Sequence, residues 1–203
     1  MSNSIAAAAT SSFDKKGTLS LGLDNVLGVA WERTVLETPE DIIGDIGFRR
    51  VVENDRSIFF ANLRDPVIPR TQLAIDYAFW PRFTAGVFGG YARRSTETDD
   101  RTSFQYGARF GYSLSISSDV ALWTKLGVSQ FRTQARPSGE FAAPTELLKG
   151  FLASAEVDLA LPLTDSVVLL AGPTYRRTLD ANTRDFSVKN DSIGLDLGLQ
   201  ISL

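Results

Sequence analysis

The chain has 203 residues, with 21 basic and 24 acidic side chains, a net charge of -3 and a mean hydropathy of -0.04. No apolar run approaches the roughly 18 residues that a membrane-spanning helix needs, which excludes a helical membrane protein but not a barrel. The sequence contains no cysteine and no histidine, which excludes disulfides, thiolate metal sites and the commonest general base. It contains no basic block, which argues against nucleic acid as a partner.

The chain opens on a stretch rich in Ser, Ala and Thr, and we expect residues 1–16 to form a flexible tail. A secretory signal needs a basic region followed by an apolar stretch of roughly 7–15 residues, and neither is complete here. One hypothesis is that Met1 replaces a removed signal peptide. A cytoplasmic protein is the alternative.

From Gly17 onward, apolar residues recur with a period of two, which is typical of strands with two unlike faces. The first strand spans about residues 17–32. Residues 35–69 break the pattern with charges and three prolines, and they predict a long external loop. Within this loop, residues 48–53 and 57–63 could pair as a small hairpin around Asn54-Asp55.

Seven further strands are expected near residues 70–79, 83–92, 103–114, 120–129, 151–160, 167–176 and 193–203. The connections after the second, fourth and sixth strands are short, and those after the first, third, fifth and seventh are longer. Outer-membrane barrels pair short periplasmic turns with long external loops in this way. The sequence therefore predicts an all-β fold: an eight-stranded antiparallel up-and-down transmembrane β-barrel over residues 17–203.

The polar face of these strands indicates which side is the interior. It consists of Gly, Ser and Ala with scattered charges, and small residues suit the crowded lumen of an eight-stranded barrel. Trp123 is expected to point inward, and Val168 and Leu170 interrupt the polar face. Charges of both signs on this face could pair with one another in the lumen, as buried charges must: Asp24, Asp76, Arg109, Lys125, Glu156, Asp158, Arg176 and Asp196.

The apolar face is aliphatic in mid-strand and aromatic toward the strand ends. Two aromatic girdles are typical of the two membrane interfaces. The alternatives are core aromatics of a soluble sandwich and a soluble lipocalin-like barrel, since alternation alone does not separate these classes. The predicted membrane-interface aromatics are Trp31, Phe79, Trp80, Phe83, Tyr91, Phe104, Tyr106, Tyr112, Phe151 and Tyr175.

The strand number, the rhythm of the connections and the alternating final segment, residues 192–203, resemble the small outer-membrane β-barrels of the OmpA/OmpX type. The resemblance covers residues 17–203 and is architectural. It implies a place in the outer membrane of a Gram-negative cell envelope, with periplasmic N- and C-termini. It also implies contact with outer-membrane lipid and lipopolysaccharide.

Catalysis is not expected. Barrel hydrolases of this kind use a histidine base, which this chain lacks. Glu156 and Asp158 form the best carboxylate pair, two apart on one strand and about 7 Å from each other, but a salt-bridge network with Lys125 and Arg109 is the simpler interpretation. Residues 97–100 contain three carboxylates that could bind a divalent cation or form an ordinary solvated loop. We therefore expect no enzyme, no cofactor and no metal.

The expected function is that of a structural or interaction scaffold which acts through its external loops, with a lumen largely filled by side chains. Ile58, Phe59 and Phe60 suggest that the loop at 35–69 contacts other envelope proteins or lipopolysaccharide, or else caps the barrel mouth. The alternatives are a narrow channel for small solutes and a soluble lipocalin-like ligand-binding barrel.

Overall fold

The computed structural model describes residues 15–42, 45–60, 68–95, 99–117, 120–137, 145–182 and 187–203. Regular structure in these ranges is entirely β-strand, and they contain no helix long and apolar enough to cross a membrane. The strands are β1 (Leu19–Ile42), β2 (Asp45–Phe60), β3 (Gln72–Trp80), β4 (Phe83–Ser95), β5 (Asp99–Ser115), β6 (Ala121–Pro137), β7 (Thr145–Pro162), β8 (Val167–Asn182) and β9 (Ser187–Ser202).

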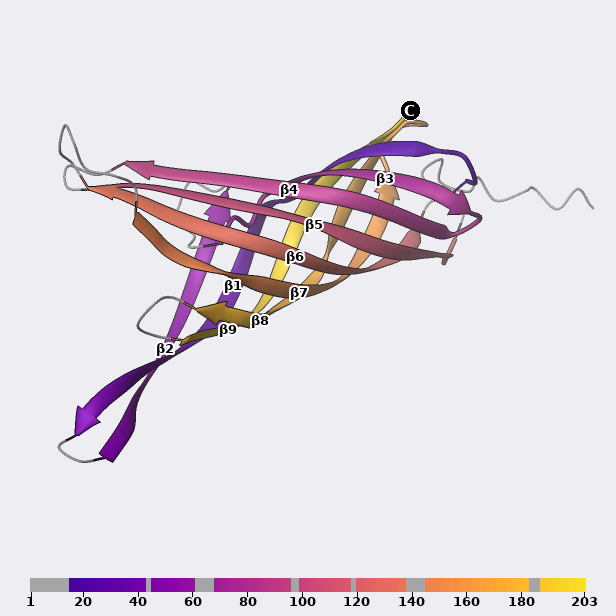
Figure 1. Cartoon of the computed structure of the whole chain (residues 1–203). Helices are drawn as coiled ribbons and strands as arrows, with labels where there is room; N and C mark the ends of the chain where they lie inside the picture. Colours follow the sequence, from indigo (N-terminus) through magenta and orange to yellow (C-terminus); the bar gives the residue numbers. More distant parts are fainter. Residues whose placement is uncertain are drawn as a thin grey trace, which may run out of the picture.

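Eight of these strands close into an antiparallel ring (Figure 1). β1 pairs with β3 along one edge and with β9 along the other, and β3 to β9 pair in chain order between them. Ser20 in β1 lies opposite Asp76 in β3 and Ser202 in β9, which joins the two ends of the sheet. A closed ring pairs the backbone groups that an open sheet would leave at its edges. The predicted all-β, eight-stranded, up-and-down barrel is confirmed.

The ninth strand, β2, corrects the predicted loop at residues 35–69. β1 continues to Ile42 and pairs with β2 from Leu27 opposite Phe60 to Ile42 opposite Asp45. Proline cannot donate a backbone hydrogen bond to a neighbouring strand, but β1 pairs with β9 only as far as Glu37. Beyond Glu37 one edge of β1 has no strand partner among the described residues, so Pro39 is tolerated there. In Figure 1 this hairpin runs out past the rim of the barrel at the lower left. Residues 61–67 of the predicted loop, and 1–14 of the predicted tail, lie outside the described residues.

The small hairpin predicted around Asn54-Asp55 is also wrong. Both residues lie inside β2, where they face Arg33 and Glu32 of β1. β1 pairs with one edge of β2 from Asp45 to Phe60 without a break, and a turn at Asn54-Asp55 would interrupt this pairing.

Ile58, Phe59 and Phe60 therefore belong to a strand, and their predicted place on a loop is wrong. They pair with Val29, Gly28 and Leu27 of β1. Ile58 shares the outer face of the wall with Val29, and it is 66% exposed. Its exposure is that of the other large aliphatic side chains on the outside of the barrel.

A bulge in β1 places Asn25 inside the barrel next to Asp24, which the strand alternation already points inward. Leu23 lies opposite Leu199 and Leu27 opposite Leu197, so three residues of β1 occupy the space of one residue of β9. Asn25 takes a left-handed conformation with φ of 54°, which asparagine tolerates better than most residues. Asp24 and Asn25 are both buried.

The two ends of the barrel differ. At the turn end, short connections join β3 to β4, β5 to β6 and β7 to β8, and β1 begins there beside the end of β9. Leu203 donates its backbone N–H to Leu19 O at 2.8 Å, which fixes the last residue at this end. We call the opposite end, where the hairpin of β1 and β2 projects, the loop end.

The two faces of the wall are the reverse of those of a soluble protein. Leu73 is 69% exposed and Val128 is 60% exposed on the outside, whereas charged and polar side chains fill the inside. Over most of their length, β3 and β9 alternate between exposed apolar residues and buried residues that are small or polar. The barrel thus presents an apolar outer surface and encloses a charged interior.

Candidate functional site

Six charged side chains meet halfway along the lumen and form what we call the central charge network. The bulge in β1 supplies one carboxylate, β3 a second and β7 two more, while β5 and β6 supply the cations. The strand register brings these groups near one another. Lys125 of β6 lies directly opposite Glu156 of β7, and Asp76 of β3 and Arg109 of β5 both lie opposite Gly86 of β4. All six are buried: Asp24, Asp76, Arg109, Lys125, Glu156 and Asp158.

Arg109 holds the two carboxylates nearest the start of the chain. Its guanidinium binds Asp76 in bidentate fashion, with Nε 2.8 Å from Oδ1 and Nη2 2.5 Å from Oδ2. Its remaining nitrogen, Nη1, donates to Asp24 Oδ2. A planar guanidinium suits this arrangement because its donors form a rigid fork.

Lys125 holds the other two carboxylates. Its Nζ lies 2.7 Å from Glu156 Oε2, 2.9 Å from Asp158 Oδ2 and 3.4 Å from Asp24 Oδ1. Asp24 therefore contacts both cations and links the two halves of the network. Both carboxylates of the Glu156–Asp158 pair contact the same ammonium group, which favours the salt-bridge interpretation of this pair over an acid–base pair.

Trp123 lies in the lumen on the turn side of the network. Its ring is fully buried and lies 4.8 Å from Lys125 Nζ and 5.6 Å from Arg109 Cζ, distances typical of cation–π contacts. Gly111 leaves room for the indole, because a Cβ at that position would lie 2.4 Å from Trp123 Nε1. Trp123 belongs to a buried apolar cluster at this end of the lumen, made of Ala121, Trp123, Ala160, Val168 and Leu170.

A second charged group lies above the network, toward the loop end. Asn25, with its amide oriented so that both atoms have complementary partners, donates to Asp196 Oδ2 at 2.8 Å and accepts from Arg176 Nη2 at 2.5 Å. Arg70 forms an ion pair with Glu32 beside them. Sequence reasoning missed Arg70 and Glu32, which lie at the ends of two predicted strands, at the start of the second and at the end of the first.

Residues 68–71, which we call the plug segment, fold into the lumen between β2 and β3. Arg176 donates to Pro69 O at 3.4 Å and to Arg70 O at 3.2 Å, and Thr71 Oγ1 donates to Asn25 O at 2.9 Å. Gly90 of β4 makes this possible, since a Cβ there would lie 2.9 Å from Pro69 Cβ. Ile68 packs against a buried apolar cluster near the loop end, made of Phe131, Leu148, Leu152, Ala181 and Val188.

The same arrangement of strands occurs in solved membrane barrels. The solid-state NMR structure of the outer membrane protein AlkL in lipid bilayers matches with a TM-score of 0.51 and 12% identity, over 100% of this chain and 97% of that one. This chain has the fold of a small outer-membrane β-barrel. Neisserial surface protein A matches with a TM-score of 0.49 and 14% identity, over 89% of this chain and 99% of that one. The N-terminal β-barrel domain of Pseudomonas aeruginosa OprF matches with a TM-score of 0.49 and 8% identity, over 93% of this chain and 98% of that one. No protein-family model and no curated protein sequence matches the chain.

The structure places all eight predicted lumen charges in the interior of this outer-membrane-type barrel. Six form the central charge network, and Arg176 and Asp196 meet through Asn25 above it. Sequence reasoning missed Asn25, Phe88 and Phe131, which are buried inside. Phe131 lies beyond the predicted strand at residues 120–129, and Phe88 is an apolar residue on a strand face that was expected to be polar.

The predicted interface aromatics lie on the outer wall in two groups. At the turn end, Phe83 contacts Phe110 and Tyr112, with ring centroids 5.8 Å and 5.0 Å away. At the loop end, the Tyr91 and Phe104 rings lie 5.1 Å apart. Nine of the ten are exposed and Phe83 is partly buried; they are Trp31, Phe79, Trp80, Phe83, Tyr91, Phe104, Tyr106, Tyr112, Phe151 and Tyr175.

Proposed function

We propose that the chain is an integral outer-membrane barrel with a sealed lumen, and that it acts as a structural or interaction scaffold through its loop end. The observation that carries this proposal is the filled interior. A layer around Trp123, the central charge network and the plug segment follow one another along the lumen, and each places buried side chains in it. Such a lumen favours a scaffold over a channel for small solutes.

The outer surface supports a place in lipid. Large aliphatic residues are exposed in mid-barrel, and aromatic residues flank them at both ends. Outer-membrane barrels carry this apolar band between two aromatic girdles. A soluble lipocalin-like barrel needs the opposite arrangement, with an apolar cavity inside and polar residues outside. The charged interior of this chain does not fit that alternative.

The hairpin of β1 and β2 is the part of the loop end most suited to contacting other molecules. β1 beyond Glu37, together with residues 45–49 of β2 that pair with it, lies outside the closed ring and projects past the rim (Figure 1). One edge of β2 is unpaired in the described chain, and exposed strand edges are templates for added strands. With short turns on the periplasmic side, the hairpin faces the cell exterior.

The test is to shorten this hairpin without touching the barrel. The register places Glu37 opposite Arg50, so residues 38–49 can be replaced by Asn-Gly, which closes a two-residue turn. The shortened barrel should still fold and insert, because its apolar band is intact, and it should lose the envelope proteins that co-purify with the full chain. An unchanged set of co-purifying proteins, or none with the full chain, would refute the interaction role.

A further inference from the structure

The outer wall at the loop end of β8, β9, β1 and β2 carries an ordered array of side chains. The register aligns them in rows across the four strands. The lower row contains Tyr175, Ile193, Trp31 and Arg56. The next row toward the loop end contains Arg177, Asp191, Arg33 and Asn54, and Lys189 follows above Asp191.

Cations outnumber carboxylates in this array. Asp191 Oδ1 lies 3.6 Å from Arg177 Nε and accepts a hydrogen bond from the Tyr175 hydroxyl at 3.1 Å. Lys189 Nζ lies 3.2 Å from Glu37 Oε2. Asp191 therefore pairs with Arg177, and Glu37 pairs with Lys189.

Arg33 and Arg56 are the remaining cations, and both are exposed. Neither guanidinium contacts a carboxylate within the part of the chain that the structure describes. They are diagonal neighbours across β1 and β2, because Arg33 faces Asn54 while Arg56 faces Trp31. Diagonal side chains of this kind lie about 7–8 Å apart at the backbone, within reach of one ligand that carries two anionic groups.

The surface beneath these two arginines is apolar. Ile58 is 66% exposed, Ile193 58% and Leu195 56%, and Trp31 and Tyr175 of the loop-end girdle lie at the boundary. A soluble anion would use only the arginines, whereas a phosphorylated lipid would place its acyl chains on the aliphatic surface and its phosphates on the guanidinium groups. Guanidinium groups bind phosphate in bidentate fashion, which suits them to this ligand.

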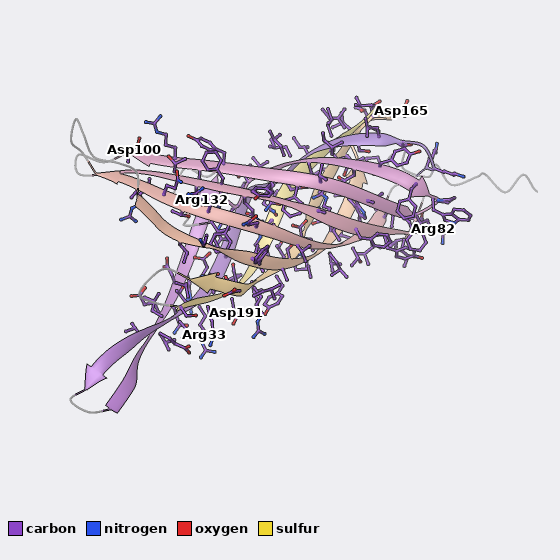
Figure 2. All side chains as sticks on the ribbon, viewed as in Figure 1. Arg33, Arg82, Asp100, Arg132, Asp165 and Asp191 are labelled. Atoms are coloured by element: carbon purple, nitrogen blue, oxygen red, sulfur yellow. The ribbon has the colours of Figure 1, made fainter. Side chains whose placement is uncertain are left out.

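We propose that Arg33 and Arg56, supported by Arg177 and Lys189, bind the phosphates of the lipid A anchor of lipopolysaccharide in the outer leaflet. The inference rests on the proposed membrane placement, with the loop end facing outward. Figure 2 shows Arg33 and Asp191 side by side near the base of the projecting hairpin, with Arg132 elsewhere at the loop end and Arg82 and Asp165 at the turn end.

The test uses the full chain folded in detergent micelles and purified diphosphoryl lipid A as the probe, with binding measured by native mass spectrometry. The double variant R33Q/R56Q should weaken the apparent affinity about thirtyfold, since each basic residue near a membrane surface contributes about a fivefold effect. Arg132→Gln is the matched control, because Arg132 is also exposed and lies opposite Phe104 of the same girdle on another part of the wall. Because Arg132 lies outside the proposed site, this variant should weaken the binding far less than the double variant does.

Two comparisons complete the test. Monophosphoryl lipid A and phosphatidylglycerol should both bind more weakly than diphosphoryl lipid A and depend less on Arg33 and Arg56. The proposal is overturned if Arg132→Gln weakens binding as much as the double variant, or if phosphatidylglycerol binds as tightly with the same arginine dependence. Insertion into lipid vesicles is measured in parallel: failure of the unmodified chain to insert refutes the proposed membrane barrel, whereas insertion without selective lipid A binding refutes only this site.

Discussion

Replacement of Lys125 by methionine tests the central charge network most severely. The ammonium group contacts Glu156, Asp158 and Asp24, and its side chain is only 3% exposed. Methionine keeps much of the volume but leaves Glu156 and Asp158 without the cation that both contact. Removing one partner of a buried ion pair costs about 3–5 kcal/mol, and we expect Lys125→Met to lower the free energy of unfolding by at least that amount.

Lys189→Met is the matched control. Lys189 also pairs with a carboxylate, Glu37 at 3.2 Å, but its side chain is 61% exposed. Exposed pairs contribute about 0–1 kcal/mol, so this variant should remain close to the unmodified chain. The measurement is urea unfolding of the barrel in phospholipid vesicles, followed by tryptophan fluorescence.

A rescue variant separates lost charge pairing from lost packing. Adding Glu156→Gln and Asp158→Asn to Lys125→Met removes the two charges left unpaired and should restore about half of the lost stability, because neutral amides cost less to bury than carboxylates. The reasoning is refuted if Lys125→Met costs no more than Lys189→Met, or if the triple variant is less stable than Lys125→Met alone.

Three further predictions concern the plug segment, conduction and catalysis. Gly90→Val should lower the free energy of unfolding by about 1–3 kcal/mol in the same urea assay, because its Cβ would lie 2.9 Å from Pro69 Cβ. Gly89→Val should lower it less, because its Cβ would lie 3.6 Å from its nearest neighbour. Equal losses for the two variants would contradict the place of the plug segment. In planar bilayers the chain should give only small or intermittent currents, and a stable conductance like that of a wide porin would show that the lumen is open. No esterase, deacylase or protease activity is expected, and reproducible turnover abolished by Glu156→Gln would overturn this expectation.

The strands of the closed ring could be predicted from the sequence, because one face of each strand is apolar and the other face carries small or charged residues. β9 shows this most clearly, with alternating exposure from Ile193 to Ile201. The buried charges followed from the same alternation, since Asp76 and Arg109 could avoid lipid only by pointing inward. These predictions depend on a period of two, which local sequence reveals directly.

The parts that the sequence did not predict depend on long-range pairing. β2 has charges at Glu53, Asp55 and Arg56, which indicate a loop until the partner strand β1 is known. The bulge turns Asn25 inward next to Asp24, and it breaks the period at the point where the plug segment is bound. Neither the extension of β1 nor the place of the plug segment can be inferred from local alternation.

The central claim is that the apolar face of the wall lies in lipid while the lumen is sealed. Because the chain contains no cysteine, single cysteines at residues 193–201 of β9 can each carry one spin label in the vesicle-inserted barrel. Labels at Ile193, Leu195, Leu197, Leu199 and Ile201 should collide strongly with oxygen dissolved in the bilayer, and labels at the residues between them should be shielded from both oxygen and a water-soluble nickel chelate. Strong nickel accessibility at the outward positions would contradict the membrane placement, and strong nickel accessibility at the inward positions would contradict the sealed lumen.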